Sequence, residues 1–450
     1  MRELPEGWTK AEIGSLCSLE NGRAFKPTDW TTTGFPIVRI QNLNNPDASF
    51  NYFNQQVDER YFLRGGELLF AWSGTPGTSF GAHVWKGGEA VLNQHIFRVD
   101  LNYDLVEKRF FRFAINQKLN ELIGIAHGGV GLRHVTKGKF ESTEVVLPPL
   151  NEQKRIANRL DQLLTRIDNT KAHLYRIPPL LKRFRQSVLA IATSGKLTAD
   201  WREEKEEIFR NWTYPYLKNV IDGIEQGWSP KCEENASNSE NEWAVIKTTA
   251  IQEMLFIEGE NKKLPQSLYP KLNLEIQEND ILITRAGPRS RAGITCLVKS
   301  VRSRLILCDK AYRFRAKADC ISPNYLVLVL NSPDTVDILD AMKTGISDSG
   351  VNLTQKKFLD LEIPLPTLEE QQEIVRRVEA LFAKADRIEA QYKNARQQVD
   401  RLTPALLAKA FRGELVPQDP KDEPASVLLE RVKEARSATQ PAKAKRKAVK

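Results

Sequence analysis

The sequence predicts an α+β fold in which two mixed α/β globular modules are joined by two long antiparallel coiled-coil helices. The first observation behind this prediction is an internal repeat: residues 147–198 align without a gap on 365–416 at a constant offset of 218, with 16 of 52 positions identical. The second is a heptad pattern in both aligned segments, and the third is a looser correspondence between the segments that precede them. Together they predict a pseudo-twofold chain that runs module, helix, module, helix.

The identical positions of the repeat include Glu152/Glu370, Gln153/Gln371, Ile156/Ile374, Arg159/Arg377, Asp168/Asp386 and Gly195/Gly413. The modules correspond only with gaps, since residues 7–9 match 211–213, 63–70 match 276–283 and 134–140 match 352–358. Because the helices have changed less than the modules, we expect the two modules to recognise different things.

Both helices carry apolar residues in alternating steps of four and three, which is the pattern of a coiled-coil seam. The predicted seam comprises Ile156, Leu160, Leu163, Ile167, Leu174 and Leu181 in the first copy, and Ile374, Val378, Leu381, Ile388, Tyr392, Val399 and Leu402 in the second. Pro178-Pro179 occurs in the first copy alone and is expected to interrupt that helix. A generic helical hairpin or a homodimer zipper is the alternative interpretation of the pattern.

These patterns divide the chain into five parts. We expect a first module at 1–150, a central helical region at 151–210, a second module at 211–366, a distal helical region at 367–430 and a basic disordered tail at 431–450. The tail is predicted to be disordered because its end, residues 441–450, is rich in lysine and low in complexity.

Composition is that of a globular protein of 450 residues, with 41% hydrophobic and 27% charged residues. The net charge of +9 suggests an acidic partner, but residues 1–150 carry 16 basic and 16 acidic side chains, and 211–366 carry 19 and 20. Any contact of the modules with nucleic acid is therefore expected to come from local clusters. The five cysteines lack zinc-site spacing and are expected to be reduced and mostly buried. With no membrane-length apolar run and no secretory start, we expect a cytoplasmic location.

Motifs of catalysis are missing from the sequence. Residues 195–198, Gly-Lys-Leu-Thr, lack the upstream glycine of a phosphate-binding loop and a Ser or Thr directly after the lysine, and there is no strand-bound GxGxxG, HExxH or GxSxG motif. Neither Pro-Pro pair has the context of an adenine methyltransferase motif, and no nuclease core is present. We therefore expect no catalytic residue, no metal site and no cofactor in this chain.

Candidate DNA contacts lie in loops that follow predicted strands. One loop, residues 71–79, offers Trp72, Ser73, Thr75 and Thr78, and the equivalent loop, 284–291, offers Arg285, Arg289 and Arg291. Closely spaced arginines in a glycine-containing loop can bond to guanine edges or to phosphates, and small hydroxyl residues can bond to bases or backbone. Solvated turns are the alternative interpretation of both loops.

A second paired region, residues 128–137 and 347–357, offers Arg133, Lys137, Asn352, Lys356 and Lys357, with glycines that permit close approach to a phosphate. An ordinary surface loop is an equally good interpretation of this region. Weaker candidates are Arg23, Lys26 and Lys247.

Several motifs resemble the specificity subunits of type I restriction-modification systems, over essentially the whole chain. They are Leu-Pro-Glu-Gly-Trp at 4–8, Pro-x-Leu-x-Glu-Gln at 148–153 and 366–371, and the runs 181–186, 195–198 and 407–415, the last of which resemble the enteric subgroup. The resemblance implies that the modules are two target recognition domains, each reading one half of a bipartite double-stranded DNA site. It implies helices that set the spacer between the halves, and the predicted rod of roughly 42 Å exceeds one DNA turn of about 34 Å.

The same resemblance implies the partners and their cofactors. Two modification subunits would bind S-adenosylmethionine and methylate adenine N6, and two restriction subunits would hydrolyse ATP with magnesium. The chain itself would be a non-catalytic subunit. Two further hypotheses stay open, a coiled-coil scaffold that does not touch DNA and a stand-alone DNA-modifying enzyme with a divergent active site.

Overall fold

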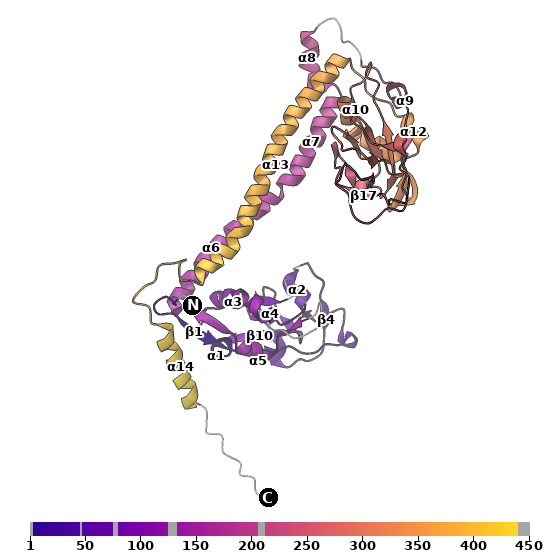
Figure 1. Cartoon of the computed structure of the whole chain (residues 1–450). Helices are drawn as coiled ribbons and strands as arrows, with labels where there is room; N and C mark the ends of the chain where they lie inside the picture. Colours follow the sequence, from indigo (N-terminus) through magenta and orange to yellow (C-terminus); the bar gives the residue numbers. More distant parts are fainter. Residues whose placement is uncertain (1–2, 46, 75–79, 125–132, 206–211, 440–450) are drawn as a thin grey trace. The chain divides into compact units, whose positions relative to one another are not determined.

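The computed structural model describes the chain except for residues 1–2, 46, 75–79, 125–132, 206–211 and 440–450. The chain forms two compact units: unit 1 comprises Met1–His173 and Arg396–Lys450, and unit 2 comprises Leu174–Ala395. Each unit contains one globular domain, domain 1 at residues 3–149 and domain 2 at 212–367, together with segments of the long helices (Figure 1). Unit 1 therefore takes its residues from both ends of the chain.

Domain 1 is built on two four-stranded sheets. The antiparallel sheet has the order β2 (Cys17–Asn21), β10 (Ile96–Leu101), β6 (Leu68–Ala71) and β8 (Gly81–Val84). The mixed sheet has the order β4 (Asn51–Phe53), β3 (Phe35–Val38), β9 (Ala90–Leu92) and β5 (Phe62–Leu63). Two short pairs are β1 (Thr9–Glu12) with β12 (Glu144–Leu147), and β7 (Ser73–Gly74) with β11 (Arg133–His134). The helices are α1 (Ile13–Leu16), α2 (Ile40–Asn44), α3 (Lys108–Gln117), α4 (Leu119–Gly124) and α5 (Lys137–Glu141), with 3₁₀ turns at Pro27–Asp29 and Glu59–Tyr61.

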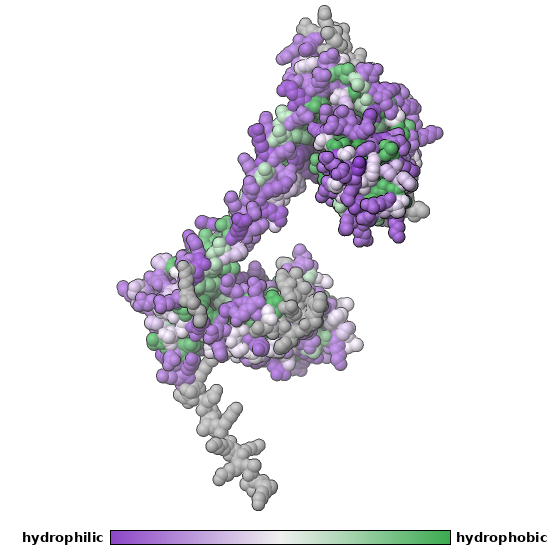
Figure 2. Space-filling model, viewed as in Figure 1, coloured by the Kyte–Doolittle hydropathy of each residue, from purple (hydrophilic) through white to green (hydrophobic). Residues whose placement is uncertain are grey.

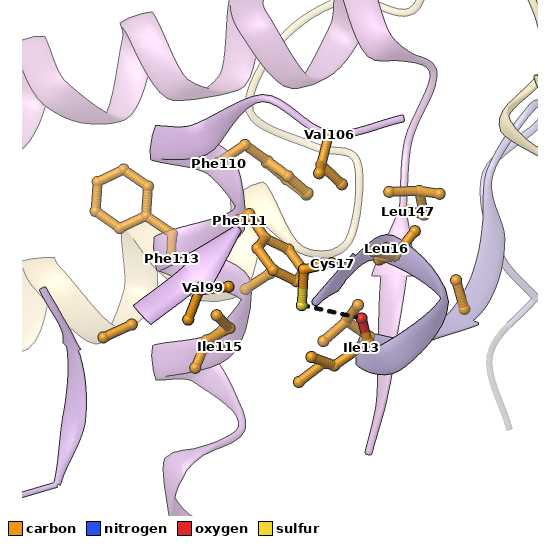
Figure 3. Packing of buried hydrophobic residues seen from close by; sticks show 14 of the residues in the cluster. Ile13, Leu16, Cys17, Val99, Val106, Phe110, Phe111, Phe113, Ile115 and Leu147 are labelled. Atoms are coloured by element: carbon orange, nitrogen blue, oxygen red, sulfur yellow. Dashed lines mark hydrogen bonds between the residues drawn. The ribbon is translucent and has the colours of Figure 1, made fainter. Parts of the chain in front are cut away.

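Strand β6 is an inner strand of the antiparallel sheet, and it is apolar at every position. All four of its residues are buried, which is typical of a strand covered on both faces. Figure 3 shows part of this core, in which aromatic residues of α3 such as Phe110 and Phe111 pack near α1. The Cys17 thiol lies in the same cluster and donates a hydrogen bond to Ile13 O at 3.3 Å.

Domain 2 repeats the order of the antiparallel sheet of domain 1 and that of the first three strands of its mixed sheet. Its antiparallel sheet runs β13 (Glu225–Gln226), β22 (Ala311–Phe314), β18 (Ile281–Thr284), β20 (Thr295–Leu297), and its mixed sheet runs β17 (Asn261–Lys263), β14 (Ala244–Ile246), β21 (Leu305–Ile306). A small sheet joins β19 (Ala286–Gly287), β24 (Gly350–Asn352) and β23 (Thr344–Ser347), and β15 (Ile251–Gln252) pairs with β16 (Leu255–Phe256). The helices are α9 (Leu217–Val220), α10 (Pro323–Leu330), α11 (Pro333–Met342) and α12 (Gln355–Leu359), with 3₁₀ turns at Thr248–Ala250 and Leu272–Leu274. The repeat predicted from the helices therefore extends through the domains.

The long helices begin directly after each domain. The first is divided into α6 (Leu150–Tyr175) and α7 (Ile177–Thr193), followed by a 3₁₀ turn (Lys196–Thr198) and α8 (Ala199–Glu204). Pro178 and Pro179 lie in the first turn of α7, so the predicted interruption is confirmed. The second helix, α13 (Leu368–Ala410), is continuous and contains Pro404 within its last turns. The two helical stretches run antiparallel, since in unit 2 Arg377 bonds to Asp200 whereas Arg185 bonds to Asp386 and Glu389.

The predicted seam is buried along most of its length. Its buried members are Ile156, Leu160, Ile167, Leu181, Ile374, Val378, Tyr392 and Val399, and its half-buried members are Leu163, Leu174 and Leu381. The prediction is wrong for Ile388 and Leu402, whose side chains are 47% and 48% exposed. Two paired helices enclose only a narrow stripe, so a heptad position at its margin stays open to solvent.

The end of the chain packs into unit 1. After α13 the chain reaches α14 (Ala425–Thr439), where Ala425, Leu428 and Leu429 join the core of domain 1. Ala425 N donates to Gly7 O at 2.9 Å, and Arg155 on α6 pairs with Asp422 at 2.7 Å. Figure 1 shows the yellow helix α14 near the indigo N-terminal strand β1. The prediction of a disordered tail at 431–450 is therefore wrong for residues 431–439. These residues continue helix α14, whose apolar residues Ala425, Leu428 and Leu429 pack in the core of domain 1. Residues 440–450 lie outside the described residues.

Other sequence expectations can be compared directly. None of the five cysteines forms a disulfide bond; Cys17, Cys296 and Cys308 are buried, and Cys232 and Cys320 are half-buried. Burial raises the pKa of Cys296 to about 12 and that of Cys308 to about 11. Among the helices of the described chain, none is both long enough and apolar enough for a membrane span. Figure 2 shows hydrophilic residues over much of the visible surface of both units.

Candidate nucleic-acid interface

Each domain is fixed to its own long helix by the Glu-Gln pair of the repeat. Trp8 Nε1 donates to Glu152 Oε2 at 3.0 Å, and Trp212 Nε1 donates to Glu370 Oε2 at 3.1 Å. Both glutamates are 1% exposed. The repeated motif therefore holds the first residues of each domain against the start of the helix that follows it.

The glutamines repeat the same geometry one residue later. Gln153 Oε1 accepts from Glu107 N at 2.9 Å and its amide donates to the carbonyls of Leu105 and Pro148. Gln371 Oε1 accepts from Ser322 N at 2.7 Å, and Gln371 Nε2 donates to Cys320 O and Pro366 O. Since these bonds satisfy buried backbone groups, they orient each domain rigidly on its helix.

The loops that carry the predicted contacts come together in pairs. In domain 1, β7 pairs with β11, so Ser73 lies opposite His134 and Gly74 opposite Arg133. In domain 2, β19 pairs with β24, so Ala286 lies opposite Asn352. The two loop regions predicted from the sequence thus meet on one surface in each domain. We call this surface the paired-loop edge; β7 and β11 form it in domain 1, and β19 and β24 form it in domain 2.

Domain 1 places an aromatic and imidazole cluster at its paired-loop edge. The ring of Trp72 stacks on Phe97 with centroids 5.5 Å apart, and it lies 5.5 Å from the ring of His95 and 5.8 Å from that of His134. Ser73 is buried, and its hydroxyl lies 2.9 Å from His134 Nδ1. Ser73 therefore orients an imidazole, and Trp72 is half-buried at the same edge.

The three arginines of the domain 2 loop are already bonded within the domain. Arg291 donates to Thr248 O, Ile251 O and Gln252 Oε1, so it holds the β15–β16 segment. Arg289 pairs with Asp340 and Asp348, and these carboxylates raise its pKa. It lines a groove of about 1340 Å³ whose lining also includes the carboxylates Asp337 and Asp386.

Arg285 donates through Nη1 to Asp309 O at 3.1 Å and lies over the ring of Tyr312, with its Cζ 5.4 Å from the ring centroid. It forms no ion pair with a carboxylate in the described part of the chain. Arg291 likewise bonds only to neutral acceptors, but it makes three such bonds, whereas Arg285 makes one.

The remaining candidates of domain 2 are exposed or weakly paired. Asn352, Lys356 and Lys357 are exposed, and no ion pair joins either lysine to a described carboxylate. Lys247 is half-buried and its Nζ lies 3.5 Å from Glu260 Oε2. The two lysines of α12 are therefore better placed for a phosphate than Lys247.

Two candidates of domain 1 are held by local contacts. Arg23 is held against aromatic rings, with its Cζ 4.6 Å from the centroid of Phe53, and Lys26 is exposed. Lys137 donates to Leu19 O at 2.9 Å and lies 3.8 Å from Glu141.

Three other candidates of domain 1 cannot be located at the level of their side chains. Thr75 and Thr78 lie outside the described residues. For Arg133 the structure describes the backbone alone.

Backbone contacts reveal equivalent residues that the sequence comparison did not align. Trp72 N donates to His95 O at 3.3 Å, and Arg285 N donates to Lys310 O at 2.8 Å. Val135 N donates to Trp72 O at 2.9 Å, and Leu353 N donates to Arg285 O at 2.7 Å. His95 and Lys310 were therefore missed as candidates, because only the hydrogen-bond pattern, and no shared residue type, relates them.

A second equivalence concerns the loop after the first strand of each antiparallel sheet. A Cβ atom at Gly22 or at Gly227 would collide with carbonyl oxygens of the neighbouring segment. The next residues make the same bond: Arg23 N donates to Leu92 O at 2.8 Å, and Trp228 N donates to Leu307 O at 2.9 Å. Trp228 is thus the counterpart of Arg23. In the sequence each of these residues directly follows a glycine, and that shared glycine is the signal by which they could have been paired.

No group of three or more His, Cys, Asp or Glu side chains within the described ranges has the geometry of a metal site. What the site offers is an edge of polar, aromatic and basic groups on each of two related domains. Such an edge suits recognition of nucleic acid by direct contact.

Comparison with known proteins agrees with this description. The type I restriction modification DNA specificity domain matches residues 5–178 and 210–396. The chain is 32% identical to the type I restriction enzyme EcoBI specificity subunit of Escherichia coli, over 99% of this chain and 95% of that protein. It is 29% identical to the EcoKI specificity subunit of Escherichia coli strain K12, over 99% of both.

Solved structures share the fold. A chain from a structural study of complex assembly and conformational transition of the type I R-M system has a TM-score of 0.68 and 20% identity, covering 92% of this chain and 100% of that chain. The HsdS subunit from Thermoanaerobacter tengcongensis has a TM-score of 0.54 and 20% identity, covering 92% and 98%. The expected fold class, two recognition domains with coiled-coil helices, is thereby confirmed.

Fold and sequence together define a DNA sequence-specificity subunit, without catalytic activity of its own. The chain belongs to the family of type I restriction-modification specificity subunits, as its motifs indicated.

Proposed function

We propose that each domain reads one half of a bipartite double-stranded DNA site through its paired-loop edge. The observation that carries the proposal is that the same two segments meet in both domains while their side chains differ. A shared backbone with divergent side chains is what two readers of different sequences require.

The charges and bonds of these side chains support different roles for individual residues of domain 2. Lys356 and Lys357 are exposed and unpaired among the described residues, so they suit phosphate contacts that position the domain. Arg285 is held by Asp309 O and Tyr312, which fixes its direction, as base contact requires. Arg289 and Arg291 suit structural roles in the same loop, because their bonds are already made within the domain.

The helices suit the roles of spacer and docking surface. Their heptads persist through both units, and most seam positions are buried. In this proposal the chain assembles with two modification subunits, which bind S-adenosylmethionine and methylate adenine N6. Two restriction subunits would hydrolyse ATP with magnesium to complete the enzyme.

The test is a footprint of the chain assembled with its modification subunits. The expected result is protection of two short DNA segments separated by an unprotected spacer, and methylation of adenine within them when S-adenosylmethionine is present. A coiled-coil scaffold that does not touch DNA would protect neither segment, and that outcome would refute the proposal.

A further inference from the structure

The equivalent positions of the two paired-loop edges carry different chemistry. In domain 1 they hold Trp72, His95 and His134, and both imidazole rings lie near the ring of Trp72. Trp72 Nε1 and His95 Nδ1 are buried without a hydrogen-bond partner among the described residues. The cluster is therefore not a fully satisfied part of the core.

In domain 2 the same positions hold Arg285, Lys310 and Asn352. Lys310 is exposed and forms no ion pair with any described carboxylate, and Asn352 is exposed on β24. Arginine and lysine donate to guanine O6 and N7, and asparagine bonds to adenine N6 and N7. The edge of domain 2 is thus rich in donors and carries two fixed positive charges.

We propose that these three positions determine which base pairs each domain accepts, so that domain 2 selects guanine with Lys310 while domain 1 selects its bases with the imidazoles beside Trp72. The inference rests on the proposed function, because it assigns the reading residues within that DNA interface.

The pattern of change argues for bases over phosphates. Phosphates are the same in every sequence, so residues that bind them gain nothing from differing between the domains. Thr136 and Thr354, which precede α5 and α12 next to these positions, are the same residue in both. Two of the three proposed positions instead differ in charge, Trp72 from Arg285 and His95 from Lys310, and the third places His134 where domain 2 has Asn352.

The protonation state of His95 supports the assignment in domain 1. Burial, and to a lesser degree repulsion by His134, lowers the pKa of His95. A neutral imidazole offers one donor and one acceptor, which a base edge can complement and an anionic phosphate cannot use fully.

The test uses the complex of the chain with its modification subunits and a DNA library randomised in both half-sites. Lys310→Met is compared with Lys357→Met, which removes a charge from α12, and with Lys262→Met, an exposed lysine on β17. We expect Lys310→Met to lose selection at one guanine-containing base pair of one half-site by roughly 10-fold or more. The other half-site should be unchanged.

The two lysine controls give different expected results. Lys357→Met should weaken binding to all sequences alike and reduce the salt slope of log K by about 1. Lys262→Met should change neither affinity nor selection. If Lys310→Met instead weakens all sequences alike, the inference is overturned.

A substitution in domain 1 provides an independent test. His95→Gln is expected to relax selection in the other half-site, whereas His173→Gln, on the exposed face of α6, should leave selection unchanged. Thermal unfolding of each variant complex verifies folding. A parent complex that binds no bipartite site would refute the proposed function, while a parent with a site that survives both substitutions intact would refute only this inference.

Discussion

Glu152 and Glu370 are equivalent residues with unequal surroundings. Glu370 Oε1 accepts from Thr198 Oγ1 at 2.7 Å and pairs with Arg202, so the buried carboxylate is fully bonded. Glu152 Oε1 has no hydrogen-bond partner among the described residues. Burial raises the pKa of Glu152, because the bond from Trp8 and the charge of Arg155 offset that effect only in part.

The two glutamates should therefore respond differently to amide substitution. Glu370→Gln is expected to lower the free energy of unfolding by about 2 kcal/mol at pH 7.5, because Arg202 loses its charged partner. Glu152→Gln is expected to cost less than about 1 kcal/mol or to stabilise, since it removes a buried charge with an unmade bond. Denaturant unfolding of both variants checks this, and equal losses would contradict it.

The pH dependence of the Glu152 effect has a defined sign. Since its folded pKa is raised, the stability that the protonated carboxyl contributes is present below its unfolded pKa of about 4.3 and is lost as pH rises through the folded pKa. The stability of Glu152→Gln relative to the parent should therefore increase as pH rises from 4 to neutrality. A relative stability that stays constant over this range would disprove the assigned shift.

At the scale of elements, close backbone packing fixes the loops that carry Arg23 and Trp228. Gly22→Ala is expected to destabilise domain 1 by about 3 kcal/mol, because the added methyl group collides with Asn93 O and Leu92 O. Gly138→Ala is a matched control: nothing lies within 4 Å of its Cβ position, and alanine favours helix α5 by up to about 1 kcal/mol. Thermal unfolding of both variants measures the difference, and similar melting temperatures would contradict the packing argument.

Helix α14 contributes to the stability of unit 1. Leu429 is 7% exposed in the core of domain 1, and Val427 on the same helix is 52% exposed. Leu429→Ala is expected to cost about 2–4 kcal/mol, and Val427→Ala less than about 1 kcal/mol. Protease resistance of residues 3–149 reports on this directly. If both variants resist equally, α14 does not support the domain.

At the scale of the whole molecule, the heptads predict that helix length sets the spacer. Inserting seven residues after both Asp168 and Asp386 preserves the seam and adds roughly 10 Å of helix. The accepted spacer should then lengthen by about three base pairs, at ~3.4 Å per pair. Mapping of methylated adenines in a library of spacer lengths measures this. An unchanged spacer would rule out the helices as its determinant.

Much of the architecture could be predicted from particular residues. The Glu-Gln pairs and the heptads indicated the duplicated helices, and Pro178-Pro179 indicated the interruption of the first one. These features could be predicted because they depend on residues close together in the sequence. The helical end of the chain could not be predicted, since the apolar face of α14 is stabilised by domain 1, which ends at residue 149, whereas α14 begins at Ala425. Ile388 and Leu402 were misassigned because a heptad does not show how wide the covering partner is.

The sequence by itself determined the repeat, the two-domain organisation and the candidate loops. Only the tertiary structure decided which loop residues are available to a ligand, because a guanidinium bonds to whichever carbonyl or carboxylate the fold brings near it. Thus Arg291 is bonded to backbone carbonyls, Arg289 to two aspartates, and Lys310, which no motif marked, lies free of described carboxylates beside Arg285. Long-range contacts of this kind depend on how the backbone folds, and local sequence patterns do not predict them.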